Sequence, residues 1–188
     1  MQHRSRRSTR RGGRLAAAVG VLGLTTTLVV AAVATPASAT YYSGGMSSRS
    51  FNVKPSGIND TWIGFLDTAR SNWNSSGAGT SIGRSSSAAA VFTAGRYSAS
   101  WYGLYTPAGI RGINRTFTIQ VNARTLEADS GSNFTAWILS TSTHELGHAV
   151  SLADNPSTSS SSLMKHSRNR TTLQKPTSYD VSEVQRIY

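Results

Sequence analysis

The sequence predicts an α+β fold for one domain that follows an N-terminal leader. Three observations support this class. Predicted strands come first and the longest predicted helix comes late, without an internal repeat, which favours α+β over alternating parallel units. Residues 40–188 number 149 of the 188, which is enough for one hydrophobic core but not for two. The chain has no cysteine, so neither disulfides nor thiolate metal sites can stabilise that core.

The first 39 residues have the three parts of a secretory signal. Six arginines lie among the first fourteen residues, an uncharged apolar stretch covers Leu15 to Ala34, and Ala37-Ser38-Ala39 supplies the small residues that a signal peptidase reads. We therefore expect residues 1–39 to be a signal peptide and residues 40–188 to be secreted. Arg10-Arg11 is a weak indication of twin-arginine export. The alternative is an uncleaved membrane anchor, because about twenty apolar residues can span a bilayer.

The first half of the mature chain contains short elements. A strand is predicted near Phe51–Lys54, because Pro55 cannot continue a ladder. Asn59 or Asp60 can cap a helix that runs to about Trp73, where apolar residues recur every three or four positions. The Gly- and Ser-rich segment 75–87 is predicted to be a loop.

Three more strands are predicted after this loop. Two of them cover Ala88–Thr93 and Ser98–Tyr105. The clearest strand is Thr116–Ala123, in which apolar and polar residues alternate strictly. A break is expected at Asp129–Asn133.

The last third of the chain is predicted to hold two helices. Asn133 is expected to cap a helix from Phe134 to about Leu152. A long serine-rich loop follows, up to Ser162, and Asp180–Ile187 is expected to be a terminal helix.

The positive charge is concentrated in the leader. The net charge is +11 for the whole chain, but residues 40–188 hold 13 Lys and Arg against all 8 acidic residues and so carry only +5. These basic residues are scattered from Arg49 to Arg186 and form no stripe. We therefore expect no nucleic-acid partner, and no membrane partner once the leader is removed.

Candidate metal-binding residues lie in the HELGH segment at residues 144–148. On a helix the i, i+4 spacing places His144 and His148 on one face, about 6 Å apart along the axis, so both imidazoles can bind one ion. Glu145 lies about 100° around the helix, where it can take a proton from a metal-bound water. Two ordinary histidines on a helix are the plain alternative.

The same periodicity predicts two faces for this helix. One face should enter the core, and the opposite face should line a cleft. The core face comprises Leu139, Leu146 and Val150, and the cleft face comprises Trp137, Thr141, His144 and His148.

A catalytic zinc site usually needs a third protein ligand. Asp154 follows His148 by six residues, beyond the predicted helix end, where a turn can bring it back toward the ion. An exposed aspartate at a helix end is the alternative reading of Asp154. His166 and Glu183 are the other candidates for this ligand.

Residues 144–154 resemble the metzincin metalloprotease signature, in which a third ligand follows the second histidine by six residues. Ser162-Leu163-Met164 is similar to the methionine turn beneath the metal in that clan, and residues 178–188 are similar to the closing helix of small bacterial members. An aspartate as third ligand resembles the snapalysin-type enzymes. The resemblance implies a small twisted, mainly parallel sheet with an active-site helix and a C-terminal helix.

Carried over by position, the resemblance implies Zn²⁺ bound by His144, His148 and Asp154, with Glu145 as general base and Met164 as the turn methionine. His166 follows Met164 by two residues, where astacin-like members have a tyrosine, so it either stabilises the oxyanion or is a bystander. The sequence departs from the clan at Ser151, where a glycine is usual because the backbone turns sharply. A side chain there costs about 1 kcal/mol if φ is positive.

The function expected from the sequence is a secreted, monomeric zinc metalloendopeptidase that acts on proteins or peptides. A secreted binding or cell-wall-associated module with a structural zinc site is the alternative, and a fourth protein ligand such as His166 would favour it. A metal hydrolase acting on another bond would use the same residues. Because no pocket can be located from the sequence, the preferred substrate side chains stay open.

Overall fold

The computed structural model describes residues 40–188, so the predicted signal peptide at 1–39 lies outside the described residues. The described residues belong to one compact unit. No helix among them is long and apolar enough to cross a membrane. Their elements, in chain order, are β1 (Ser50–Pro55), α1 (Asp60–Asn74), β2 (Ser81–Arg84), β3 (Ala90–Gly95), β4 (Gly103–Ala108), β5 (Thr116–Asn122), α2 (Ala123–Ser130), the 3₁₀ turn Gly131–Asn133, α3 (Phe134–Ala149) and α4 (Ser178–Ile187).

The five strands form one mostly parallel sheet in the order β2-β1-β3-β5-β4. Only β4 runs antiparallel to its neighbour β5, with Tyr105 opposite Ile119. The prediction of a mixed fold with a mainly parallel sheet is confirmed. The alternation predicted for β5 is confirmed up to Val121, because Phe117, Ile119 and Val121 are each no more than 1% exposed. It fails at the end of the strand, where Asn122 is fully buried and Ala123 begins α2.

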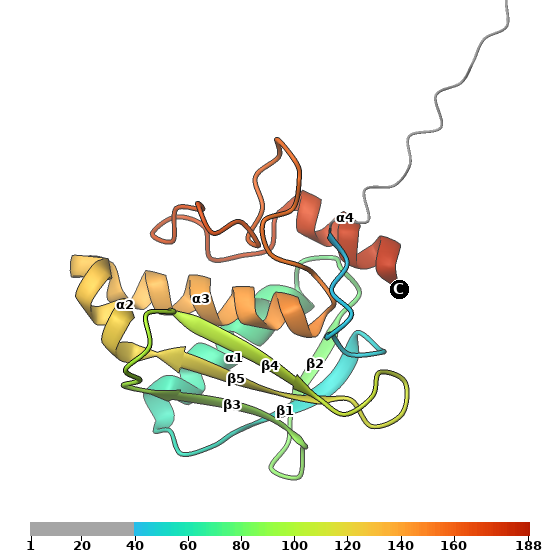
Figure 1. The fold of residues 1–188 in the computed structure, drawn as a ribbon, viewed down its shortest axis with the longest axis horizontal. Coiled ribbons are helices and arrows are strands. Elements are labelled where there is room, and N and C mark those ends of the chain that lie inside the picture. Colours follow the sequence, from blue (N-terminus) through green and yellow to red (C-terminus); the bar gives the residue numbers. More distant parts are fainter. Residues whose placement is uncertain (1–39) are drawn as a thin grey trace, which may run out of the picture. The chain divides into compact units, whose positions relative to one another are not determined.

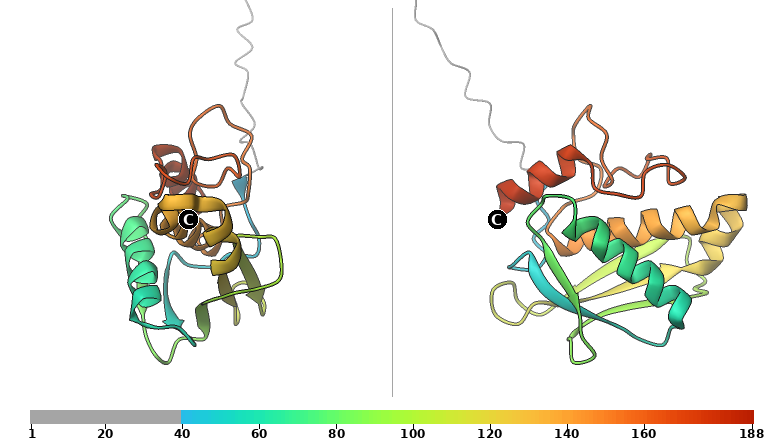
Figure 2. Two further views of the ribbon diagram at one scale, coloured as in Figure 1. Left: turned by 90° about the vertical axis from the view of Figure 1, so that its left-hand side faces the viewer. Right: turned by 180° about the vertical axis from the view of Figure 1, so that it is seen from behind.

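Helices α1 and α3 lie side by side over one face of the sheet (Figures 1 and 2). Trp73 of α1 is fully buried and its indole Nε1–H donates to the carbonyl of Thr143 in α3 at 2.8 Å. The segment 150–188 covers the side of α3 that faces away from the strands (Figure 1). Helix α3 is therefore enclosed between the sheet and the C-terminal segment.

The predicted division of α3 into two faces is confirmed only in part, because this enclosure buries the helix on all sides. Every residue from Ser140 to Ala149 is buried, on all sides of the helix. Leu146 and Val150 lie in the core as predicted, but Leu139 is only half-buried. The helix period identifies the face toward the sheet, but it carries no information about a distant segment that covers the other face.

The helix ends also differ in part from the predictions. Asn59 caps α1 as predicted, since its Oδ1 accepts from the backbone N–H of Trp62 at 3.3 Å. Asn133 makes no side-chain capping bond, so the prediction that it caps α3 is wrong. The 3₁₀ turn continues directly into α3 there. Helix α3 ends at Ala149 instead of about Leu152, because the chain reverses at Ser151.

Two elements were missed in the sequence. Strand β2 lies inside the predicted loop 75–87, where Ile82 is the buried apolar residue and Asn74 bonds both its backbone N–H, at 2.8 Å, and its carbonyl, at 3.1 Å. Helix α2 precedes the predicted break, capped by Asn122, and buries Leu126. Both elements depend on one buried side chain and on tertiary contacts, which composition does not reveal.

Ser151 adopts the left-handed backbone conformation, with φ of 68°. The resemblance to metzincins implies this conformation, because a glycine is usual at the corresponding position. The Ser151 hydroxyl compensates for the steric cost. Arg111 Nη1 donates to Ser151 Oγ at 2.7 Å, and Tyr188 Oη lies 2.9 Å from the same oxygen. Gly45 packs directly on this residue, since a Cβ at Gly45 would lie 2.3 Å from Ser151 Oγ.

We expect Ser151→Ala to destabilise the protein more than Ser151→Gly does. The alanine keeps the unfavourable φ and loses both hydrogen bonds, at a cost of about 1–2 kcal/mol. The glycine loses the same bonds but relieves about 1 kcal/mol of strain. Urea unfolding of the two variants measures the difference, and an alanine variant at least as stable as the glycine variant would contradict this account.

Candidate metal centre

His144 and His148 lie one helical turn apart in the buried half of α3. Their residues are only 4% and 8% exposed, and their ring centroids are 4.9 Å apart. Both rings are held by backbone carbonyls. His144 Nδ1 is 3.0 Å from the carbonyl oxygen of Leu163, and His148 Nδ1 is 2.8 Å from that of Leu152. A carbonyl only accepts, so each Nδ1 carries the hydrogen and each Nε2 presents a lone pair.

Asp154 faces these two lone pairs. Its Oδ1 lies 3.1 Å from His144 Nε2 and 3.5 Å from His148 Nε2. A carboxylate and two imidazole nitrogens that all accept would repel one another, and a cation between them resolves this conflict. Neighbouring ligands of tetrahedral zinc lie about 3.3 Å apart for bonds of about 2.0 Å, so the three donors fit zinc.

The three ligand atoms lie within 4.8 Å of one another, which makes His144, His148 and Asp154 a candidate metal-binding group. Protonation of the imidazole rings would also relieve the repulsion between these acceptors, but both rings resist protonation. Burial, together with the charge of Arg168, lowers the pKa of His144 to about 3, and burial also lowers the pKa of His148. Neutral imidazoles are the form that binds a metal.

His166 is close to the group but is held in a different way. Its Nε2 lies 3.0 Å from Asp154 Oδ1, and its Nδ1 lies 3.1 Å from Asn155 Nδ2. Asn155 Oδ1 accepts from the backbone N–H of His166 at 2.8 Å, which orients the amide so that Nδ2 donates to the ring. Nδ1 is then an acceptor, and the hydrogen on Nε2 is donated to Asp154. In this arrangement the Nε2–H of His166 points at the Asp154 carboxylate.

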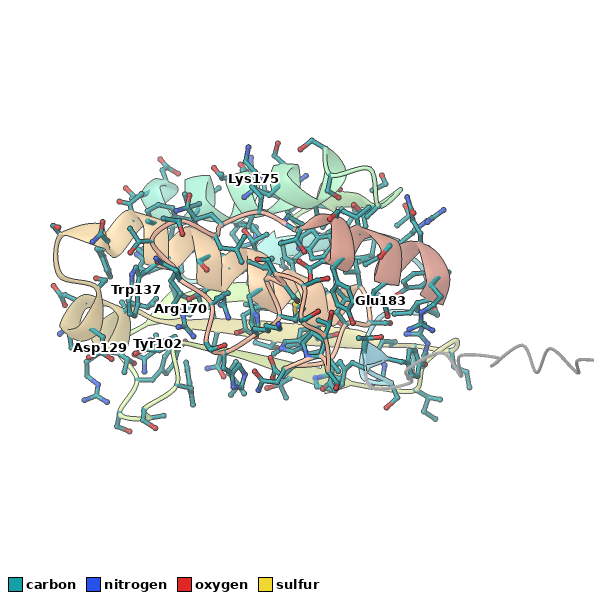
Figure 3. The ribbon with its side chains drawn as sticks, turned by 90° about the horizontal axis from the view of Figure 1, so that it is seen from above. Tyr102, Asp129, Trp137, Arg170, Lys175 and Glu183 are labelled. Carbon is teal, nitrogen blue, oxygen red and sulfur yellow. The ribbon has the colours of Figure 1, made fainter. Side chains whose placement is uncertain are left out.

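Glu183, the other candidate for the third ligand, is engaged elsewhere. It pairs with Arg186 at 2.7 Å and accepts a hydrogen bond from Thr40. Figure 3 shows Glu183 on α4, well apart from Tyr102 and Arg170 of the cleft. The structure thus brings Asp154 to the two histidines and leaves Glu183 away from them.

Glu145 lies beside the histidines and is 4% exposed. Its Oε1 is 4.0 Å from His144 Nε2. Burial, reinforced by the charge of Asp154, raises the pKa of Glu145 to about 8. A carboxylate with a raised proton affinity is suited to accept a proton from a neighbouring water.

A cleft of about 560 Å³ opens over this group. Strand β4 forms one side through Gly103, Leu104 and Tyr105. Gly103 allows the close approach, because a Cβ there would lie 2.3 Å from Glu145 Oε1. The predicted cleft face of α3 is confirmed for Thr141, His144 and His148, whereas Trp137 does not line this cleft and donates to Thr171 at 3.2 Å.

The floor of the site is a turn fastened to α4. Met164 is 1% exposed and lies against Gly147, where a Cβ would be 2.5 Å from its Sδ. Asp180 holds this turn in place, since it accepts from Ser162 Oγ at 2.6 Å and from the backbone N–H of Leu163 at 2.9 Å. Because the carbonyl of Leu163 faces His144, Asp180 orients a ring of the candidate metal-binding group through one intermediate residue.

Sequence reasoning missed several residues of the site, among them Asp180, Arg168 and Arg170. The sequence did carry a signal for Asp180, because Thr177 and Asp180 form a capping box, and the same carboxylate reaches the turn. Arg168 and Arg170 also line the cleft. They follow Met164 by four and six residues in a loop without periodicity, so no sequence signal identifies them.

Comparison with known proteins gives a likeness of fold. No family model matches the chain, and no curated protein sequence matches it. A chain of the GM1-bound form of the ECX AB5 holotoxin is similar, with a TM-score of 0.58 and 13% identity over 79% of this chain and 84% of that one. Archaemetzincin from Methanopyrus kandleri has a TM-score of 0.47 and 13% identity, over 77% of this chain and 96% of that one. At this identity the first likeness shows the fold alone.

Proposed function

We propose that this chain is a secreted zinc-dependent endopeptidase of the metzincin type, with residues 1–39 as signal peptide and residues 40–188 as catalytic domain. The observation that carries the proposal is the convergence of His144, His148 and Asp154 at the bottom of an open cleft, with buried Glu145 beside them. The resemblance of residues 144–164 to the metzincin signature supports the same assignment.

In this proposal His144, His148 and Asp154 hold Zn²⁺. A zinc ion supplies a more acidic water and polarises the carbonyl that is attacked. Glu145 accepts the proton of the attacking water and passes it to the leaving amide nitrogen. His166 keeps the Asp154 carboxylate directed at the ion through its hydrogen bond.

Strand β4 is proposed to hold the substrate backbone. It is the last strand of the sheet and is paired only with β5, so its outer edge offers unpaired backbone groups to an extended peptide. Strand β5 does not suit this role, because it is an interior strand between β3 and β4.

The alternative of a binding or wall-associated module with structural zinc requires a closed site with four protein ligands. Among residues 40–188, His166 is the remaining histidine close to the group. Its hydrogen bonds to Asn155 and Asp154 favour a positioning role, and the cleft leaves the metal group open to a substrate. These observations favour the enzyme over the module.

Peptide hydrolysis by purified residues 40–188 tests the proposal. We expect cleavage of an unfolded protein such as casein, loss of cleavage with a chelator, and recovery when zinc is added. Fragments from the interior of the substrate would identify an endopeptidase. A zinc-loaded protein that cleaves no peptide bond would reject the proposal, and size-exclusion chromatography would test the expected monomer.

A further inference from the structure

The cleft contains two guanidinium groups that have no role in the proposed catalytic mechanism. Arg168 and Arg170 line it together with His144 and Glu145. Arg168 is 8% exposed, and Arg170 is half-buried. Among the described residues, no carboxylate lies within ion-pairing distance of either group. Burying a charge without a partner is costly, which indicates that a ligand supplies the missing negative charge.

Arg168 is fixed in place with part of its hydrogen-bonding capacity unused. Its Nε donates to Ser140 Oγ at 3.0 Å, and its Nη1 donates to the carbonyl of Lys165 at 3.1 Å. Within residues 40–188 its Nη2 has no hydrogen-bond partner. Burial, reinforced by the charge of Arg170, lowers the pKa of Arg168 to about 9 against the opposing charges of Glu145, Asp154 and Asp180, none of which pairs with it directly.

Arg170 is held by aromatic rings. Its guanidinium carbon lies 4.7 Å from the ring centre of Tyr102 and 5.5 Å from that of Trp137. Tyr102 is itself fixed, since its hydroxyl donates to Asp129 at 2.7 Å. The Nε of Arg170 is buried and has no partner among the described residues. Figure 3 shows Arg170 between Tyr102 and Trp137, with Asp129 beyond Tyr102.

The charges that line the cleft favour the binding of an anion beside Arg168 and Arg170. Asp154 is engaged by three histidines, and the proposed zinc ion adds two positive charges that offset Asp154 and Glu145. Arg168 and Arg170 then give the cleft a net positive charge. A planar carboxylate fits guanidinium donors that are already oriented, because little side-chain entropy is lost on binding.

We propose that Arg168 and Arg170 form a subsite that binds a carboxylate of the peptide substrate, so that the enzyme prefers peptides with an acidic side chain next to the cleaved bond. This inference rests on the proposed peptidase function. The free C-terminal carboxylate of a peptide has the same chemistry and is the other source to distinguish. The alternative is that Arg168 has a structural role alone, in which it links the carbonyl of Lys165 to Ser140 of α3.

The test begins with a peptide library cleaved by the zinc-loaded protein, which identifies the position where Asp and Glu are enriched. Matched peptides with Glu or Gln at that position, blocked at both ends, then give a ratio of kcat/KM. We expect about a 10-fold preference for Glu, the equivalent of one hydrogen bond to a charged group. A second pair with a free C-terminus shows whether the chain end is preferred instead.

Three variants separate recognition from structure. Arg170→Gln is expected to remove most of the Glu-over-Gln preference, measured as the ratio of kcat/KM for the two peptides. Arg168→Lys keeps a positive charge at this buried position of the cleft, and we expect it to lower the Glu-over-Gln preference in part. Lys175→Gln removes an exposed charge outside the cleft and should leave the ratio unchanged, as its place in Figure 3 indicates. Thermal unfolding verifies that each variant is folded.

The outcomes distinguish this inference from the proposed function. Cleavage with equal rates for Glu and Gln peptides, or a preference that both arginine variants retain, would overturn the subsite and leave the peptidase intact. If no peptide is cleaved, isothermal titration calorimetry with zinc-loaded Glu145→Gln protein compares the affinities for the Glu and Gln peptides and so tests the subsite without catalysis. Equal affinities there would overturn the subsite, and tighter binding of the Glu peptide that Arg170→Gln abolishes would support it.

Discussion

Glu145→Gln is expected to abolish peptide hydrolysis while zinc stays bound. The amide has the shape of the carboxylate but cannot accept a proton, so the loss should be about 10²–10⁴-fold in kcat, the usual contribution of general acid–base catalysis. Glu145 is 4% exposed beside the candidate ligands, and the substitution removes a buried group whose pKa burial has raised to about 8. We therefore expect the variant to fold and to be no less stable than the parent.

Initial rates with a fluorogenic peptide and metal analysis of the same samples measure the two halves of this prediction. Glu127→Gln is the matched control, because Glu127 is an exposed glutamate that pairs with Arg96 on the surface. Hydrolysis by Glu145→Gln at the parental rate would reject Glu145 as the base. Loss of zinc together with loss of activity would show that Glu145 belongs to the ligand set instead.

Asp154→Ala is expected to weaken zinc binding by more than about 100-fold, the upper end of the loss seen when only an outer-shell partner is removed. The alanine removes the oxygen that lies 3.1 Å from His144 Nε2 and 3.5 Å from His148 Nε2. His166→Ala should weaken binding by only about 10-fold, because it removes a hydrogen bond to a ligand.

Competition with a zinc-binding dye measures these affinities. Glu183→Ala is the control, since Glu183 pairs with Arg186 and lies outside the candidate group. Asp154→Ala and Glu183→Ala proteins with equal affinity for zinc would show that the metzincin-type ligand set is wrong. A loss in His166→Ala as large as that in Asp154→Ala would instead favour His166 as a ligand and the structural-zinc alternative.

The parts of the site that could be predicted are those encoded by local spacing. His144 and His148 meet because a helix repeats every 3.6 residues, and Asp154 reaches them because the chain reverses at Ser151. The cap of α1 by Asn59 is similarly local.

The parts that could not be predicted depend on contacts between distant segments. Burial of α3 on all sides requires segment 150–188 to cover it, and β2 forms because β1 pairs with it in register. Arg168 lies in an irregular loop, where neither period nor motif marks a residue that faces the cleft. Asp180 was visible as part of a capping box, but its second role at the turn follows only from the tertiary fold.

The bond between Asp180 and the turn at Leu163 has a consequence for biogenesis. A polypeptide leaves the ribosome or an export channel from its N-terminus, so all three proposed ligands emerge before the residue that fastens the loop beneath them. Until α4 docks, the turn that carries the Leu163 carbonyl lacks the bonds from Asp180 that hold it beneath His144. In the proposed metallopeptidase, activity would therefore arise only once α4 has docked and the turn is fixed.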